Sequence, residues 1–423
     1  MNCCPSKGLG MTSRRAFLTA TAGALLTALP ARAADTTGDH VGFHRHWMRR
    51  GDGKGGWLSH PAEIQFLHRK PGAGIKAFGI AQMDNGEVIL AASWDDGTTA
   101  KDKEKPVMAF SRDGGRGWSE FQLVENMTGR PVMLTYAGKG HVWFQTDINK
   151  PTKQVFSSDY GRTWAERRVI QPPSIDGSFG GMDGAFGSEG NALVELGPDG
   201  TARRIGVIGY TYKKGTKFPD DPAIGMLRWS ADGGRTWSKE TIPKAWFWQD
   251  EYKGKTYTRG VSEGSLVRAS NGWLVAALRT DMPYRFVELH NDNLEGIAIS
   301  ISKDDGVTWS PLNVLYQGGR MHANLLRMPN GHLVMTYIVR QDYEGIQRVS
   351  YRRGCEALIS RDHGLTWNLK DKYVLDEFEY SDGTPLSLAC GHLSSTLLTD
   401  GHILTTYSNY VAQAAVVIRW KPL

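Results

Sequence analysis

Short apolar runs separated by tight glycine turns recur along the chain, and no stretch carries the long 3.6-residue apolar stripe of a helical bundle. Apolar residues flank six such turns: Asn85-Gly86, Lys139-Gly140, Asp199-Gly200, Asn271-Gly272, Asn330-Gly331 and Asp400-Gly401. Most of them predict a β-hairpin with a two-residue loop, and Lys139-Gly140 is the weakest. The six glycines are separated by 54, 60, 72, 59 and 70 residues, which is about the length of a four-stranded sheet with a variable loop.

A second repeat alternates with the hairpins. The pattern Ser-x-Asp-x-Gly-x-Thr-Trp, called the Asp box, begins at Ser111, Ser157, Ser230, Ser302 and Ser360, with Gly117 in place of Thr in the first copy. In each copy the Asp carboxylate can accept hydrogen bonds from backbone N–H groups, and the Gly can adopt a left-handed conformation. The closing Trp is a large apolar plug. Five copies indicate a repeated supersecondary unit.

Six repeated sheets predict an all-β fold, a six-bladed β-propeller, in which radial repetition protects the strand edges. Ten per cent aromatic residues and 50 glycines also fit a turn-rich β protein. The sixth sheet runs out of chain near Leu423, so ring closure requires an N-terminal strand, which we place within Glu63–Leu67. Two stacked β-sandwiches are the alternative.

The N-terminus has the features of an export signal. Ser13-Arg14-Arg15-Ala16-Phe17-Leu18 matches the twin-arginine pattern, and an apolar run leads to an A-x-A cleavage site at Ala31-Arg32-Ala33. The apolar run is too short to span a bilayer. We therefore expect a signal peptide at residues 1–33, an N-terminal arm at 34–56 and the propeller at 57–423. The mature protein would be periplasmic or secreted, with no membrane anchor.

Loss of that segment changes the charge and the cysteine count. The formal net charge falls from +6 to +2 when Lys7, Arg14, Arg15 and Arg32 are removed, so the basic composition does not indicate nucleic-acid binding. Cys355 and Cys390 remain, either bridged or as two buried thiols, and their spacing is not a zinc pattern. The chain has no Walker loop and no dinucleotide fingerprint, so we expect no cofactor and no metal.

Hairpin geometry predicts where the chemistry lies. In a two-residue hairpin, cross-strand partners have residue numbers with a constant sum. That rule pairs Lys76 with Asp95, and it sets Glu263 diagonal to Arg279 and His322 diagonal to Arg340. It also sets His392 opposite Asn409 and beside Tyr410. Arg130, Glu189 and Tyr210 fall at similar positions in the other blades.

All these residues lie at the open ends of their hairpins, and propeller symmetry would bring those ends to one face. Arginine binds carboxylates through a planar fork, and a protonated carboxyl can act as a general acid, so the set suits an acidic sugar. The alternative is that these are solvated charges at strand ends.

Five Asp boxes on six hairpins resemble the sialidase (neuraminidase) superfamily of six-bladed propellers over residues 60–423. In that family the boxes lie away from the active site, which implies structural roles for Asp113, Asp159, Asp232, Asp304 and Asp362. The resemblance also implies that Glu263 and Arg279, sixteen residues apart, are the family's Glu and carboxylate-binding Arg. It makes Arg353 the second such arginine, with Arg352 as the fallback, and Asp95 or Asp96 the acid/base.

Two positions depart from the family pattern. Lys76 stands where the first carboxylate-binding arginine is usual, and it could hold a carboxylate as a point charge. Gly391-His392 stands where the family commonly has Gly-Tyr with a nucleophilic tyrosine, so Tyr380 or Tyr410 would have to replace it.

Three functions follow from these residues. The first is an exo-glycosidase acting on a terminal acidic or modified sugar, with Arg279 and Arg353 binding the carboxylate. In it Asp95 donates the proton and Glu263 polarises His392 or a water. The second is a polysaccharide lyase that removes a proton α to a uronate carboxylate through His392, His322 or Tyr410 beside Arg340. The third is a non-catalytic glycan-binding propeller.

Overall fold

The computed structural model describes residues 44–67, 74–95, 104–146, 152–175, 177–179, 182–183, 186–215, 220–289, 292–344, 347–383 and 388–423. The chain divides into two compact units, residues 1–34 and 35–423. The predicted signal peptide, including its cleavage site, lies outside the described residues. The predicted domain boundaries stay predictions.

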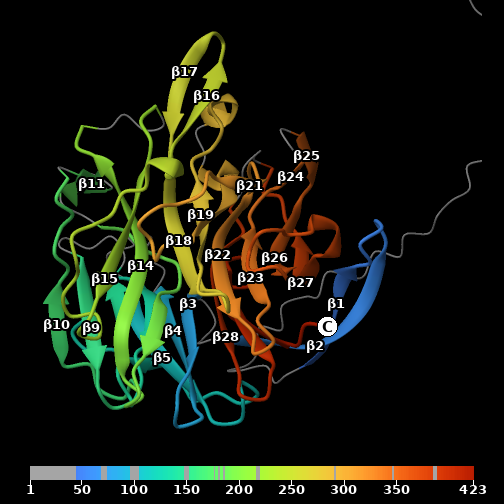
Figure 1. The fold of residues 1–423 in the computed structure, drawn as a ribbon. Helices are drawn as coiled ribbons and strands as arrows, with labels where there is room; N and C mark the ends of the chain where they lie inside the picture. The colour runs from blue at the N-terminus through green and yellow to red at the C-terminus, as the bar shows by residue number, and fades with distance from the viewer. Residues whose placement is uncertain are drawn as a thin grey trace, which may run out of the picture. The chain divides into compact units, whose positions relative to one another are not determined.

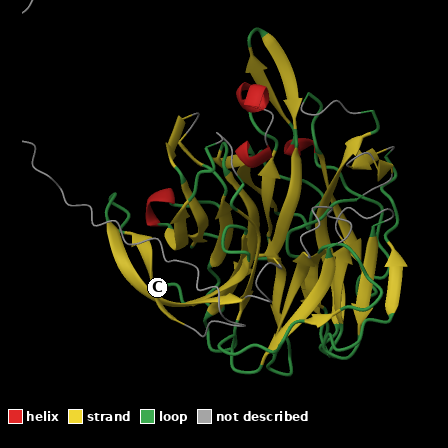
Figure 2. Ribbon diagram, turned by 180° about the vertical axis from the view of Figure 1, so that it is seen from behind, coloured by secondary structure: helices red, strands yellow, loops and turns green. Residues whose placement is uncertain are grey.

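The described chain is almost entirely antiparallel β-structure (Figures 1 and 2). Its helices are short 3-10 turns: η2 (Lys244–Trp246), η3 (Tyr284–Leu289), η4 (Asp292–Leu294) and η5 (Leu369–Asp371). None of the helices in the described ranges is long and apolar enough to cross a membrane.

Successive groups of strands form six blades, numbered here in chain order. Blade 1 contains β3 (Gly74–Gln82), β4 (Val88–Asp95), β5 (Lys105–Ser111) and β6 (Gln122–Leu123). Blade 2 contains β7 (Pro131–Tyr136), β8 (Val142–Thr146), β9 (Lys153–Ser157) and β10 (Glu166–Val169). Blade 3 contains β13 (Leu193–Leu196), β14 (Ala202–Lys213) and β15 (Ile224–Ser230), with β11 (Gly177–Phe179) and β12 (Met182–Asp183) at its edge.

The second half of the ring continues the pattern. Blade 4 contains β18 (Val261–Arg268), β19 (Leu274–Thr280), β20 (Gly296–Ser302) and β21 (Asn313–Tyr316). Blade 5 contains β22 (Arg320–Arg327), β23 (Leu333–Val339), β26 (Arg352–Ser360) and β27 (Tyr373–Glu379). Blade 6 contains β28 (Cys390–Leu397), β29 (Ile403–Asn409), β30 (Ala414–Trp420) and β2 (Trp57–Leu67).

The remaining strands form hairpins or link blades. The hairpin of β16 (Trp248–Tyr252) and β17 (Lys255–Arg259) projects beyond the blades directly before β18 (Figure 1). A second small hairpin pairs β24 (Asp342–Glu344) with β25 (Gln347–Ser350). Strand β1 (His44–Gly51) pairs with β2 and, at Arg49 and Arg50, with β27.

The ring closes where the sequence predicted. Residues Glu63–Leu67 of β2 pair with β30, from Glu63 opposite Arg419 to Leu67 opposite Ala415. This confirms the N-terminal closing strand. Because β2 completes blade 6, the edge of β30 is paired instead of exposed.

The core consists of apolar layers between neighbouring blades. Leu134 and Phe144 of blade 2, for example, pack against Ile89 and Phe110 of blade 1. A comparable cluster lies between each successive pair of blades, including blades 6 and 1. This closed ring of inter-blade cores confirms the predicted six-bladed propeller and excludes the alternative of two stacked β-sandwiches.

The Asp boxes form the hydrogen bonds to backbone N–H groups that the sequence predicted. In the third copy, Asp232 Oδ1 accepts from the backbone N of Thr236 at 2.8 Å, and Ser230 Oγ accepts from Gly234 N at 2.8 Å. Trp237 packs into the core between blades 2 and 3. Each box follows the third strand of its blade, so it lies at the hairpin end. Ser302, for instance, pairs with Leu274, next to the turn.

The hairpin loops differ from the prediction. In each of the six hairpins, a backbone hydrogen bond joins the two residues on either side of a three-residue loop. In the first hairpin, for example, Met83 N donates to Glu87 O at 2.8 Å. The glycine is the last of the three, with φ between 77 and 89°. This is a three-residue loop in which glycine adopts the left-handed conformation, and it shifts the register by one residue from that of a two-residue loop.

Candidate functional site

The candidate site lies at the end of the propeller opposite the hairpin loops, where the inner strands begin. Five inner strands change register there, between Ala77 and Gly79, Val132 and Thr135, Val261 and Gly264, Met321 and Asn324, and Gly391 and Leu393. A bulge inserts an unpaired residue and re-aims its side chain, and bulges recur beside active sites. Glu263, His322 and His392 all lie in these bulges, and both histidines have positive φ (53° and 46°).

The bulges also correct two predicted pairings. Each bulge shifts the register by one further residue, so Lys76 lies opposite Ser93 and Asp95 lies opposite Gly74. Asn409 lies opposite Cys390, not opposite His392. The predicted Lys76–Asp95 and His392–Asn409 pairs are therefore wrong.

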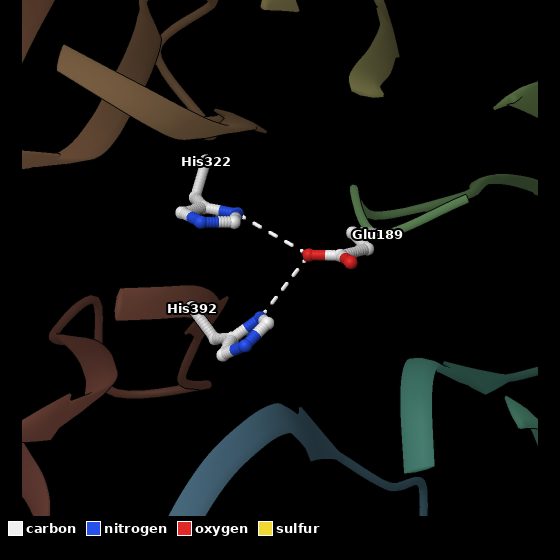
Figure 3. A group of neighbouring side chains, drawn as sticks. All are labelled: Glu189, His322 and His392. Carbon is white, nitrogen blue, oxygen red and sulfur yellow. Dashed lines mark ion pairs between the residues drawn. The ribbon is translucent and has the colours of Figure 1, made fainter. Parts of the chain in front are cut away.

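Six side chains from blades 3 to 6 meet at this end and are called here the central cluster: Glu189, Glu263, Arg279, His322, Arg340 and His392. Glu189 Oε2 lies 3.1 Å from His392 Nδ1 and 3.5 Å from His322 Nδ1, so one carboxylate oxygen stands between two imidazoles (Figure 3). The two rings are 5.0 Å apart between centroids. Glu189 follows an isolated bridge between Gly187 and Tyr210, outside regular strand.

The predicted pairs Glu263–Arg279 and His322–Arg340 are in contact. Arg279 Nη1 donates to Glu263 Oε1, and Arg279 Nε pairs with Glu295. Arg340 Nη2 lies 2.9 Å from His322 Nε2. Since a guanidinium can only donate, Nε2 of His322 must accept, and its Nδ1 carries the proton. That N–H faces Glu263 Oε2 at 3.1 Å.

The two carboxylates of the central cluster have opposite pKa shifts. Burial and the neighbouring charge of Glu263 raise the pKa of Glu189 above its usual 4.5. Burial would also raise the pKa of Glu263, but Arg279, His322 and Arg340 outweigh it and lower that pKa. Glu189 therefore binds its proton more tightly than Glu263 does, although both lie beside the same histidine.

Burial and nearby positive charge also act on His392 and Tyr410. Burial, His322, Arg130 and Arg340 lower the pKa of His392 well below 6.5, so its imidazole is neutral at pH 7. Burial raises the pKa of Tyr410 to about 12 despite Arg340 and Arg130, so its phenol keeps its proton.

Glu189, His322 and His392 also form a potential metal-binding triad, because one ligand atom from each lies within 4.8 Å of the others. A metal on Nδ1 of His322 would move the ring proton to Nε2, and a ligating histidine normally donates that proton to an acceptor. Here Nε2 faces Arg340, which is a donor. The residues therefore do not fit a resident metal.

A second ionic group borders the central cluster. Lys76 Nζ lies 2.8 Å from Glu104 Oε1, and Arg130 Nη2 lies 3.0 Å from the same oxygen. Arg130 lies over the ring of Phe78, which packs against His392 with centroids 4.3 Å apart. Lys76 is thus near the predicted face, with its charge compensated by a carboxylate that sequence reasoning missed.

The predicted site residue Arg353 bonds to groups outside the central cluster. Arg353 has no solvent exposure and donates to Gln341 Oε1 at 3.2 Å and to the carbonyl of Arg352. The side chain of Asp95 and all of Asp96 lie outside the described residues. Tyr410, by contrast, is close to Arg340, because both would contact a Cβ placed on Gly391. Glu104 and Glu295 lacked a sequence signal, since each lies just before a third strand instead of on a predicted hairpin.

Comparison with known proteins places the fold. No protein-family model and no curated protein sequence matches the chain. A protein of unknown function from Dyadobacter fermentans DSM 18053 has a similar structure, with a TM-score of 0.56 and 17% identity over 84% of this chain and 97% of that one. The Hadza microbial sialidase Hz136 gives a TM-score of 0.54 and 12% identity over 83% of this chain and 66% of that one.

An α-L-arabinanase from Penicillium chrysogenum, complexed with arabinobiose, gives a TM-score of 0.49 and 12% identity over 90% of this chain and 98% of that one. At 17% and 12% identity, the similarities to the Dyadobacter fermentans protein and to Hz136 establish the fold alone. The chain has a sialidase-like β-propeller fold, which confirms the prediction from the repeats.

Proposed function

We propose that this chain is a glycosidase that hydrolyses the bond to a terminal acidic or otherwise modified sugar of a glycan. The observation that carries the proposal is the pair Glu189 and Glu263, two largely buried carboxyl groups beside one histidine with pKa values shifted in opposite directions. Glycosidases use two carboxylic groups, one protonated and one ionised, and environments that separate their pKa values assign the roles. The sialidase-like fold supports the same class of reaction.

In this proposal Glu189 is the general acid. Its raised pKa favours the protonated form, which donates its proton to the leaving glycosidic oxygen, and its side chain retains 11% exposure. His392 Nδ1, at 3.1 Å, holds the carboxyl in place. Glu189 thus takes the role that the resemblance implied for Asp95.

Glu263 is the ionised partner. Arg279 contacts one of its carboxylate oxygens and His322 the other, so the position of its negative charge is fixed. Such a charge stabilises the oxocarbenium-like centre or polarises the attacking water, and it needs no reorganisation when the positive charge develops.

Elimination is the second candidate, favoured by one specific observation. His392 is neutral at pH 7 because its pKa is lowered, so it can remove a proton α to a uronate carboxylate, and Arg340 can neutralise the enediolate that forms.

A substrate screen tests the proposal. Purified protein is incubated with chromogenic glycosides of acidic and neutral sugars and with uronate-containing polysaccharides. Hydrolysis releases the chromophore or a saturated reducing sugar, whereas elimination yields an unsaturated product that absorbs in the ultraviolet. We expect Glu189→Gln and Glu263→Gln each to abolish hydrolysis. The control Glu195→Gln removes a carboxylate paired with Arg268 away from the central cluster and should keep it. Binding without turnover by the wild-type protein would contradict both reactions and favour a glycan-binding propeller.

We also propose export through the twin-arginine route, on the strength of Arg14-Arg15 and the Ala31-Arg32-Ala33 site. N-terminal sequencing of protein from the periplasm or medium should begin at Ala34. Retention of wild-type protein in the cytoplasm, equal to that of the Arg14→Lys/Arg15→Lys variant, would contradict export by this signal.

A further inference from the structure

The strand ladder of blade 5 does not fix how Arg340 lies against His322. At the site end, the pairing of β22 with β23 stops at Arg320 opposite Val339, so Arg340 lies beyond it. His322 lies inside the bulge of β22, where the ladder is interrupted. The contact of 2.9 Å between Arg340 Nη2 and His322 Nε2 therefore joins two residues that regular strand pairing does not hold.

A buried ion pair connects the two chain segments that carry these residues. Arg320 lies two positions before His322, and Asp342 lies two positions after Arg340. Arg320 Nη2 donates to Asp342 Oδ1 at 2.5 Å. Arg320 is 3% exposed and Asp342 is 7% exposed, so water screens this pair little.

Backbone hydrogen bonds reinforce the same connection. The backbone N–H groups of Arg340 and Gln341 both donate to Gly319 O, at 3.0 and 3.2 Å. In return, Arg320 Nη1 donates to the carbonyl of Gln341 at 3.1 Å. Only glycine permits this approach at position 319, because a Cβ there would lie 2.1 Å from the same carbonyl oxygen. Residues 319–322 and 340–342 are thus held together as one unit.

Asp342 has further partners, and none of them belongs to the central cluster. Its Oδ2 accepts from Ser350 Oγ at 2.6 Å, and Arg352 Nη2 lies 3.3 Å from its Oδ1. Burial would raise the pKa of Asp342, but Arg320 and Arg352 outweigh it and lower that pKa, so the carboxylate is ionised at pH 7. Because desolvation offsets much of the attraction in a buried ion pair, such a pair is a weak source of stability but can specify one geometry.

The geometry that this pair specifies determines which nitrogen of His322 carries a proton. Since a guanidinium cannot accept, Nε2 stays unprotonated while Arg340 faces it, and the Nδ1–H of His322 faces Glu263 Oε2 at 3.1 Å. If the guanidinium moved away, Nε2 could bind a second proton. The resulting imidazolium would offset the negative charge of Glu263.

We propose that Arg320 and Asp342 are positioning residues of the site: their ion pair holds Arg340 against His322, which keeps His322 a neutral hydrogen-bond donor to Glu263. This inference rests on the proposed function, in which Glu263 is the ionised partner. Neither residue contacts the central carboxylates itself, and both act through Arg340. Neither was among the site residues predicted from the sequence.

Isotope-edited NMR of protein labelled in its histidine ring nitrogens tests the geometry without a substrate, because the nitrogen shift distinguishes a protonated ring nitrogen from an unprotonated one. The signals of His322 are identified by their loss in His322→Gln. In the wild type at pH 7 we expect an unprotonated Nε2 and a protonated Nδ1. Asp342→Asn keeps the shape of the side chain but removes its charge, and it should give a protonated Nε2 in a measurable fraction of molecules.

Kinetics with the chromogenic glycoside that the wild type cleaves fastest tests the consequence. Asp342→Asn should lower kcat about 10- to 100-fold with little change in KM, because a misplacement of about 1 Å near the reacting groups costs about this much. The control Asp400→Asn removes a carboxylate from Arg419, which is 4% exposed and lies in blade 6, away from the central cluster. It should leave the His322 signals and kcat unchanged.

Arg320→Lys is a second variant that applies if Asp342→Asn does not fold. It keeps the positive charge but cannot bond to the Gln341 carbonyl and to Asp342 together, so it should give the same two changes. A protonated Nε2 in the wild type would overturn the inference, as would unchanged His322 signals or unchanged kcat in the folded variants. Equal changes in Asp400→Asn would also overturn it. The expected NMR change in a protein that cleaves no glycoside would overturn the proposed function alone, whereas hydrolysis by a wild type with a protonated Nε2 would overturn only this inference.

Discussion

Glu104→Gln should destabilise the propeller in a pH-dependent manner. Glu104 is 3% exposed and holds Lys76 Nζ at 2.8 Å, Arg130 Nη2 at 3.0 Å and the hydroxyl of Ser93. Glutamine has nearly the same shape, but it has no charge and presents an NH₂ group to two cations. The substitution therefore removes the counter-charge of a buried ionic group with little change in packing.

The pKa shift of Glu104 sets the size of the expected loss in the free energy of unfolding. Burial alone would raise it, but Arg130, Lys76 and Ser93 lower it from 4.5 to about 2. Because each pKa unit is worth ~1.4 kcal/mol, the ionised carboxylate contributes about 3 kcal/mol to the free energy of unfolding at neutral pH. The folded-state pKa is below the unfolded value, so this contribution is complete above pH 4.5. It is lost as the pH falls towards 2, and at pH 3 about half or less of it remains.

Urea denaturation of wild type and Glu104→Gln, followed by tryptophan fluorescence, measures this difference at pH 7 and pH 3. We expect a gap of about 3 kcal/mol at pH 7 that at least halves at pH 3. Glu87→Gln is the control: Glu87 also pairs with two arginines, but Arg112 is 83% exposed, so the loss should stay below about 1 kcal/mol. Equal stability of Glu104→Gln and wild type at pH 7, or a gap that does not change with pH, would refute the reasoning.

Three further predictions concern other parts of the chain. Because the pKa of Glu189 is raised and its protonated form is the acid, wild-type activity should decline as the pH rises through that pKa, and a kcat/KM profile that stays flat from pH 5 to 9 would contradict the role. Asp232→Ala removes the hydrogen bonds to Thr236 and Arg235, so it should lower the free energy of unfolding by about 1–2 kcal/mol, as measured by urea titration. Activity per folded molecule should stay unchanged, and loss of activity in fully folded protein would show that this turn belongs to the site. Cys355 and Cys390 are buried free thiols whose pKa values are raised by burial. A thiol reagent at pH 8 should therefore label them only after denaturation. Rapid labelling of the native protein would show that one of them is accessible.

The errors in register show which part of the site the sequence could predict. An Asn-Gly turn is compatible with a two-residue or a three-residue loop, and the bulges near the inner-strand starts carry no clear sequence pattern. The Lys76–Asp95 pairing failed for this reason. The contacts Glu263–Arg279 and His322–Arg340 survived the shift, because long side chains on adjacent strands reach diagonal neighbours as well as direct ones.

The identity of the acid shows what the sequence could not supply. The sequence placed Glu189 only among several residues at similar positions in the blades. In the structure Glu189 lies in a segment without regular strand structure. Its contacts with His322 and His392 join residues more than 130 positions apart, and its raised pKa comes first from burial. Neither property is visible in the residues around position 189.

The amino-acid sequence by itself determined the repeated unit, because a glycine turn and an Asp box are interactions among residues within eight positions of one another. It also determined the number of blades and the strand that closes the ring, since apolar periodicity and chain length constrain both. Only the tertiary structure decided which charged groups meet in the central cluster and in which direction their pKa values shift. Those properties depend on burial and on charges from four different blades, which the chain brings together only when the ring is closed.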